Sequence, residues 1–113
     1  MMPHKDEIRL RHMLDHAREA VDMIKGKREK DLKNERMLEL ALVRLIEIVG
    51  EAAARISSEE QEKWPSIPWQ HVIGMRNRLI HGYDSVDIKI LWNTLDEDLP
   101  KLIRALEKIL RAS

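Results

Sequence analysis

The sequence has 113 residues, which suit one domain and leave no room for a second. Basic and acidic side chains number 20 each, so the formal net charge is zero and the molecule as a whole does not attract nucleic acid. The lack of cysteine excludes disulfides and thiolate metal sites, and no apolar run is long enough to span a bilayer. We therefore expect one domain over residues 1–113, in the cytoplasm and away from membranes.

A helix is predicted from about His4 to Lys25. Its apolar positions recur at alternating steps of four and three residues, the spacing of one helix face: Leu10, Leu14, Ala17, Val21 and Ile24. Gly26 and the mixed charges that follow, up to Asp31, predict a solvated connection.

The strongest helical pattern runs from about Leu32 to Ile56. Apolar residues cover much of the circumference of this helix, which predicts a central position. In so small a domain, such a helix can bury one flank against its own chain and another against a second copy. Gly50 lies within it and would allow close contact with a neighbouring helix.

Shorter segments follow this central helix. Ser57 is predicted to cap a short helix that ends near Trp64. Two prolines then predict a turn, and the next helix runs from Trp69 to about Ile80. We expect both tryptophans to anchor the turn to the core, in preference to stacking on nucleic-acid bases.

The last helical region begins with a cap formed within Asp84 to Asp87. A break is expected near Asp98 because Pro100 clashes with the preceding turn and lacks an amide proton. Four main helices and one short connector predict an all-α fold, an antiparallel bundle of four to five helices.

Reactive side chains concentrate in residues 74–83, at the end of the helix that begins at Trp69. Asn77 and His81 lie one turn apart, whereas Arg76 lies about 140° around the helix from His81, so Arg76 must reach or the last turn must unwind. Gly82 can adopt a left-handed conformation and swing Tyr83 back toward the helix end. We expect Arg76, His81 and Tyr83 around one small space.

A guanidinium and an imidazole at one site have a defined chemistry. The guanidinium stabilises a phosphoryl group that gains charge, and the imidazole moves protons near neutral pH. Together they suffice to cleave RNA through attack of the 2′-hydroxyl on its own phosphate, and they would spare DNA, which lacks that hydroxyl. The alternative is structural, because cations near a helix C-terminus interact well with the helix dipole.

The motif Arg76, four residues, His81, Gly82, Tyr83 resembles the Arg-x4-His-x-Tyr motif of HEPN-domain proteins, in particular the HepT-type toxins encoded beside minimal nucleotidyltransferases. The likeness covers roughly residues 5–110. It includes three further segments in the same order: 47–53, 67–69 and 91–100.

This resemblance implies a HEPN-like homodimer whose motif ends face one another across a cleft. It implies a metal-independent endoribonuclease that needs no cofactor and acts as the toxin of a toxin–antitoxin pair. Arg76 would stabilise the phosphate and transition state, and His81 would transfer protons. Tyr83 would be the site at which the partner nucleotidyltransferase, the antitoxin, attaches AMP and silences the enzyme.

Three further residues are candidates for a supporting role: Asn77, Arg78 and Glu51. Glu51 could hold one of the motif arginines, and either Arg76 or Arg78 could lie nearer the phosphate. Two other functions stay open on the sequence alone. The bundle could be a non-catalytic subunit that binds a nucleotide or substrate for the nucleotidyltransferase, or a purely structural helical dimer.

Overall fold

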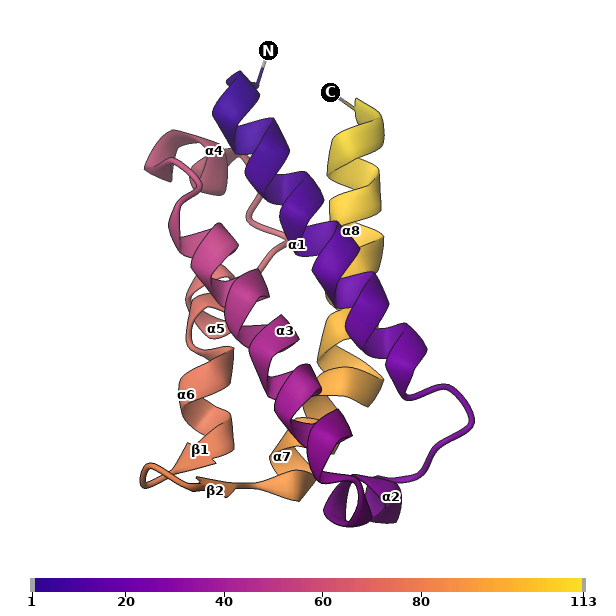
Figure 1. Ribbon diagram of the computed structural model, residues 1–113. Helices are drawn as coiled ribbons and strands as arrows, with labels where there is room; N and C mark the ends of the chain where they lie inside the picture. Colours follow the sequence, from indigo (N-terminus) through magenta and orange to yellow (C-terminus); the bar gives the residue numbers. More distant parts are fainter. Residues whose placement is uncertain (1, 113) are drawn as a thin grey trace.

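The computed structural model describes residues 2–112 and shows an elongated helical bundle built on three long helices (Figure 1). They are α1 (His4–Met23), α3 (Arg36–Ala54) and α8 (Leu99–Ala112). Helix α1 packs along both α3 and α8, and the two chain ends lie together at one end of the bundle. The predicted all-α bundle is confirmed.

Shorter elements complete the bundle at the end opposite the chain termini and along one side (Figure 1). They are α2 (Glu29–Asn34), α4 (Ser58–Lys63), α5 (Trp69–Ile73), α6 (Met75–Leu79), α7 (Ile88–Asn93), a π-helical turn (Thr94–Asp98) and a two-stranded hairpin of β1 (Ile80–His81) and β2 (Ser85–Val86). None of the described helices is both long enough and apolar enough to cross a membrane.

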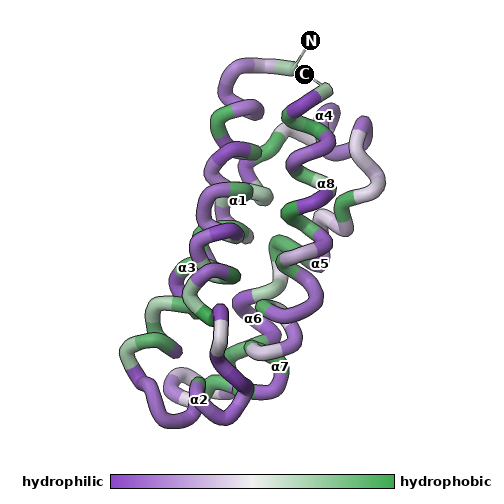
Figure 2. Tube along the Cα trace, turned by 90° about the vertical axis from the view of Figure 1, so that its right-hand side faces the viewer, coloured by the Kyte–Doolittle hydropathy of each residue, from purple (hydrophilic) through white to green (hydrophobic). Residues whose placement is uncertain are grey.

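Apolar side chains recur once or twice per turn along the three long helices and meet between them. Figure 2 shows this alternation of hydrophobic and hydrophilic positions along the chain. The largest side chains with almost no solvent exposure come from six α-helices, the π-helical turn and the loop before α5: Leu10, Met13, Leu32, Leu42, Ile46, Ile67, Leu79, Leu91, Leu95, Leu99, Leu106 and Ile109. Burial of such side chains contributes about 1.5–3 kcal/mol each, which makes this shared core the main source of stability.

Three predicted helices differ from the observed ones. The first ends at Met23, before Gly26 turns the chain with a φ of 76°. The segment predicted as one helix from Leu32 is divided at Glu35, whose non-helical backbone separates α2 from α3. The helix predicted from Trp69 to Ile80 is divided at Gly74 into α5 and α6.

Gly50 brings α3 and α5 into backbone contact. A Cβ at this position would lie 3.2 Å from the carbonyl oxygens of both Val72 and Ile73. Such a distance is tighter than ordinary van der Waals contact, so any side chain here would push against the α5 backbone, and glycine permits the observed approach. The close helix contact predicted at Gly50 is confirmed, and it fixes the segment that leads into α6 against the central helix.

The predicted break before Pro100 is replaced by the π-helical turn, through which α7 continues into α8. Proline cannot donate to the helix ladder and its ring crowds the carbonyl four residues earlier, and a wider turn relieves both problems. The hydroxyl of Thr94, the first residue of this turn, donates to the backbone carbonyl of Ile90 at 2.9 Å and so gives that carbonyl a hydrogen-bond partner. The helical region is therefore disturbed at the predicted place, where the helix type changes between Asp98 and Leu99, but the chain stays helical and no break occurs.

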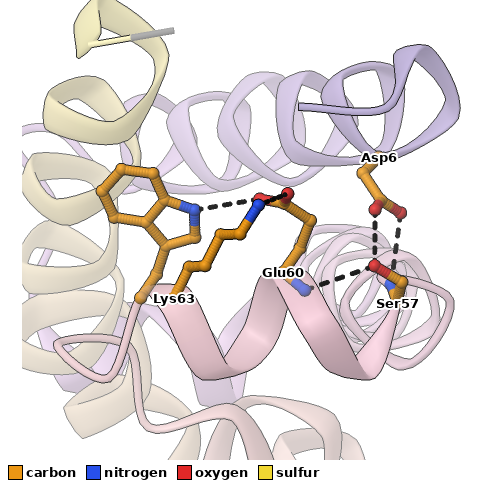
Figure 3. Close-up of polar contacts among 5 residues, drawn as sticks. Asp6, Ser57, Glu60 and Lys63 are labelled. Atoms are coloured by element: carbon orange, nitrogen blue, oxygen red, sulfur yellow. Dashed lines mark hydrogen bonds and ion pairs between the residues drawn. The ribbon is translucent and has the colours of Figure 1, made fainter. Parts of the chain in front are cut away.

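Buried carboxylates fix α4 near the chain termini (Figure 3). Asp6 of α1, only 3% exposed, accepts hydrogen bonds from the backbone nitrogen and hydroxyl of Ser57 at 3.2 and 2.7 Å. The Ser57 hydroxyl in turn accepts from the amide of Glu60 at 3.3 Å, which confirms the predicted cap. The Glu60 carboxylate, also buried, accepts from Lys63 and from the indole of Trp64.

The second tryptophan secures the turn that follows α4. The indole nitrogen of Trp69 donates to the carbonyls of Gln61 and Trp64 at 3.0 and 3.1 Å. The expectation that these tryptophans anchor the turn is confirmed. As a result, α5 begins at a fixed position relative to α4.

Candidate active site

The motif residues lie at the end of the bundle opposite the chain termini, where α6 passes into the hairpin (Figure 1). Helix α6 ends at Leu79, one residue before the predicted end, and Ile80 is already extended. Residues 80 and 81 then pair antiparallel with residues 86 and 85. Gly82 turns the chain with a φ of 68°, as expected of glycine, but within a hairpin instead of a helix cap.

Asp87 closes this hairpin at its base. Its backbone nitrogen donates to the carbonyl of Leu79 at 2.7 Å, which joins the end of α6 to the start of α7. Its side chain caps α7, since Oδ1 accepts from the amide of Ile90 at 3.0 Å. The predicted cap is confirmed at this residue.

His81 contacts the same carboxylate. Its Nε2 lies 3.1 Å from Oδ2 of Asp87, and its side chain is 63% exposed. The amide of Ile90 and, secondarily, the His81 imidazole hold the pKa of Asp87 below its usual value. Asp87 is therefore ionised at neutral pH, and His81 is an exposed imidazole tethered by a carboxylate.

Arg76 faces the central helix. Its Nε lies 3.7 Å from Oε2 of Glu47 on α3, and Glu47 also accepts from Arg44 at 2.8 Å. The Arg76 side chain is nearly half exposed, so the pair lies at the surface and is screened by solvent. A phosphate could replace Glu47 as the partner of this guanidinium.

Arg78 has a different environment. Its Nη2 donates to the carbonyl of His71 at 2.5 Å, at the C-terminal end of α5. A Cβ at Gly74 would lie 3.2 Å from Nη1 of Arg78, so the guanidinium packs over this glycine. Arg78 therefore binds the backbone at the junction of α5 and α6, which leaves Arg76 as the arginine available to a phosphate.

Tyr83 does not fold back toward the helix end. It is 100% exposed at the tip of the hairpin. Within residues 2–112 no hydrogen bond or ion pair joins any two of Arg76, His81 and Tyr83. The three side chains are therefore not joined by direct contacts within a single chain, because the hairpin carries the tyrosine outward from the bundle.

The candidates for a supporting role also differ from expectation. Glu51 is exposed and its ion pair runs to Arg44 at 3.9 Å, so the carboxylate that holds a motif arginine is Glu47 instead. Asn77 is exposed on α6, and among the described residues its side chain has no hydrogen-bond partner.

Sequence reasoning missed one contact and placed another on the wrong residue. Asp87 was predicted only as a helix cap, and its contact with His81, six residues away, depends on a hairpin that the sequence did not reveal. The sequence pointed to Glu51 as the acid that could hold a motif arginine, whereas the contact is made by Glu47, because α6 packs against α3. In the described part of the chain, no three histidine or acidic side chains converge to form a metal site.

A helical bundle that presents an Arg-x4-His-x-Tyr motif at one exposed end is a HEPN-type domain. The family described as "Ribonuclease HepT-like" matches residues 13–109. The chain therefore belongs to the HepT-like ribonuclease family.

Curated relatives agree with this assignment. The chain is 36% identical over 100 residues to a protein of Thermococcus cleftensis named as a probable ribonuclease HepT, covering 85% of this chain and 91% of the relative. It is 35% identical over 95 residues to a protein of Methanocaldococcus jannaschii named as a candidate RNase, covering 84% and 87%. A candidate RNase of Caldanaerobacter subterraneus is 34% identical over 102 residues, covering 90% and 91%. No solved structure matches the chain.

Proposed function

We propose that this protein is a metal-independent endoribonuclease in which Arg76 and His81 cleave RNA. The observation that carries the proposal is the exposure of both side chains beside carboxylates at the hairpin end, where a phosphodiester can reach them. The imidazole removes the proton from a 2′-hydroxyl, whose oxygen attacks the adjacent phosphorus. The 5′-oxygen then leaves with a proton from a general acid, giving a 2′,3′-cyclic phosphate and a free 5′-hydroxyl.

Arg76 supplies the electrostatic part of this reaction. The pentavalent phosphorane carries more negative charge than the substrate, and a guanidinium donates hydrogen bonds to its oxygens without losing its own charge. Glu47 orients the Arg76 side chain before RNA binds and yields it to the phosphate. The proposed reaction needs no metal ion, because side chains supply both the positive charge that stabilises the phosphorane and the groups that transfer protons.

We further propose that the enzyme works as a homodimer formed through α3. On the outward face of this helix Met37 is 86% exposed and Leu40 is about half exposed, a large apolar surface to leave in water. Arg76 packs on the flank of the same helix through Glu47. A dimer through α3 would bring two copies of Arg76 and His81 to one cleft, so that one histidine acts as base and the other as acid.

Cleavage of a fluorescent RNA oligonucleotide by the purified protein tests the catalytic assignment. His81→Ala should lower kcat about 10²–10⁴-fold, and Arg76→Ala about 10²–10³-fold, with far-UV circular dichroism unchanged. His4→Ala and Arg104→Ala are matched controls, since both residues are exposed and lie on other parts of the bundle. If both motif variants cleave as fast as the parent, the chain is not a nuclease of this kind and the non-catalytic subunit becomes the better interpretation.

We propose that the same site serves a role as the toxin of a toxin–antitoxin pair. We propose that a partner nucleotidyltransferase transfers AMP from ATP to the phenolic oxygen of Tyr83, with release of pyrophosphate. The fully exposed phenol at the hairpin tip is accessible to another enzyme, and the added phosphate would compete with RNA for Arg76 and His81. Bound AMP would therefore silence cleavage.

Intact mass spectrometry after incubation with the nucleotidyltransferase and ATP tests this modification. Because the chain has a single tyrosine, Tyr83→Phe leaves no phenol and should gain no AMP. Ser85→Ala, in the same hairpin, should be modified like the parent. A gain of AMP by Tyr83→Phe would refute the proposed acceptor.

A further inference from the structure

His81 meets Asp87 through one particular nitrogen. Nε2 of the imidazole lies 3.1 Å from Oδ2 of Asp87, while the amide of Ile90 occupies Oδ1 at 3.0 Å. The carboxylate is therefore held at both ends, by a helix N-terminus and by the imidazole. It cannot rotate toward His81 or away from it without uncapping α7.

The charge on this carboxylate decides which nitrogen of His81 carries the hydrogen. An ionised carboxylate only accepts hydrogen bonds, and the lowered pKa of Asp87 keeps it ionised at neutral pH. Nε2 must then be the donor. In a neutral imidazole with Nε2 protonated, the free lone pair lies on Nδ1.

Resting on the nuclease function proposed above, we infer that Asp87 is a positioning residue and that Nδ1 of His81 takes the proton of the 2′-hydroxyl. Asp87 does not touch the RNA. It selects the tautomer, orients the ring and stabilises the imidazolium that forms when Nδ1 is protonated. The backbone bond from Asp87 to Leu79 holds this carboxylate in register with the end of α6, which also carries Arg76.

Asp87→Asn tests the inference directly, because asparagine has one side-chain oxygen and can accept a hydrogen bond with it from only one of the two neighbours, Ile90 or His81. Asparagine caps helices as well as aspartate does, so its oxygen is expected to accept from Ile90. Its NH₂ group then faces Nε2 of His81, which must become an acceptor, and the hydrogen moves to Nδ1. The variant should keep its fold and invert the tautomer.

Asp87→Ser separates the loss of ring orientation at His81 from the inversion of its tautomer. Serine also caps helices, and its single oxygen would be used by Ile90, so His81 would lose its partner without being forced into either tautomer. Asp84→Asn is the matched control, since Asp84 lies in the same hairpin and its ion pair with Arg36, at 4.0 Å, is exposed at the surface.

Two measurements on the full chain decide the inference. In ¹⁵N-labelled protein, His81 should show the Nε2–H tautomer in the parent and in Asp84→Asn, and the Nδ1–H tautomer in Asp87→Asn. The His81 signals are assigned by their loss in His81→Gln. In cleavage assays kcat should fall about 10²-fold or more in Asp87→Asn and less in Asp87→Ser, with KM unchanged and both variants still fully folded at the assay temperature.

The Nδ1–H tautomer in the parent, or a parental kcat in Asp87→Asn, would overturn the inference. A fall in melting temperature that accounts for the whole loss of activity would also overturn it, because Asp87 would then act only as a cap. If the parent itself cleaves no RNA, the nuclease proposal fails, while the tautomer of His81 is still settled by the spectrum.

Discussion

Replacing Asp6 by alanine removes both hydrogen bonds that join α1 to the start of α4. The carboxylate is 3% exposed and accepts from the backbone nitrogen and hydroxyl of Ser57. A net contribution of about 1.5 kcal/mol for each hydrogen bond to a charged group gives a predicted loss of about 3 kcal/mol in the free energy of unfolding. In a domain of this size that loss lowers the melting temperature by roughly 10 °C or more.

Urea denaturation followed by circular dichroism measures this loss, and two variants isolate its cause. Asp6→Asn keeps an oxygen for the Ser57 amide and can donate to the Ser57 hydroxyl, so it should lose less than half as much as Asp6→Ala. Asp15→Ala, on the exposed face of the same helix, should change the free energy of unfolding by no more than about 0.5 kcal/mol. The double variant of Asp6 and Ser57 should be less destabilised than the sum of the two single variants, because they share one interaction. A loss below about 0.5 kcal/mol in Asp6→Ala would refute the view that this buried pair fixes α4.

Three further predictions follow from other parts of the bundle. Gly50→Val should lower the free energy of unfolding by about 1–3 kcal/mol in urea titrations, because the valine side chain would collide with α5 carbonyl oxygens that lie 3.2 Å from the Cβ position. Ala54→Val is the control, since Ala54 is exposed on the same helix and its replacement should not destabilise the fold in this way. Replacing Met37 and Leu40 together by glutamate should convert a dimer to a monomer in light scattering and abolish cleavage, and an unchanged mass would exclude α3 as the interface. Because the pKa of Asp87 is lower in the folded chain, its ionised form stabilises the fold above the ordinary aspartate pKa of about 3.9, and this contribution is lost as the pH falls through the folded pKa. The difference in urea midpoint between the parent and Asp87→Asn should accordingly shrink below about pH 4, and a difference that grows with acid would contradict this sign.

Periodicity was enough to predict the long helices and the all-α bundle, because burial along one face dictates where apolar residues fall. It did not predict the division at Glu35, where neither glycine nor proline marks the end of a helix. The hairpin was also missed, since two residues in each strand are too few to show alternation. Pro100 signalled a disturbance correctly, but its form as a π-helical turn depends on packing against the rest of the bundle.

The sequence was enough to predict which residues form the motif of the candidate site, but not how their side chains are arranged in space. Arg76, His81 and Tyr83 were singled out by residue type and order, whereas their partners come from elements that are distant in the sequence or unpredicted. Glu47 reaches Arg76 because Gly50 lets the segment before α6 approach α3 closely. Asp87 reaches His81 because the chain reverses at Gly82.

The two chain ends lie together at the pole of the bundle farthest from the hairpin (Figure 1). A tether attached through either end would therefore leave Arg76, His81 and Tyr83 pointing away from the support. Protein immobilised in this way on a sensor chip or bead should capture RNA and be modified at Tyr83 as readily as protein free in solution. The same arrangement makes the ends suitable points for fluorescent labels that report on tumbling without obstructing the end of the bundle that carries these three residues.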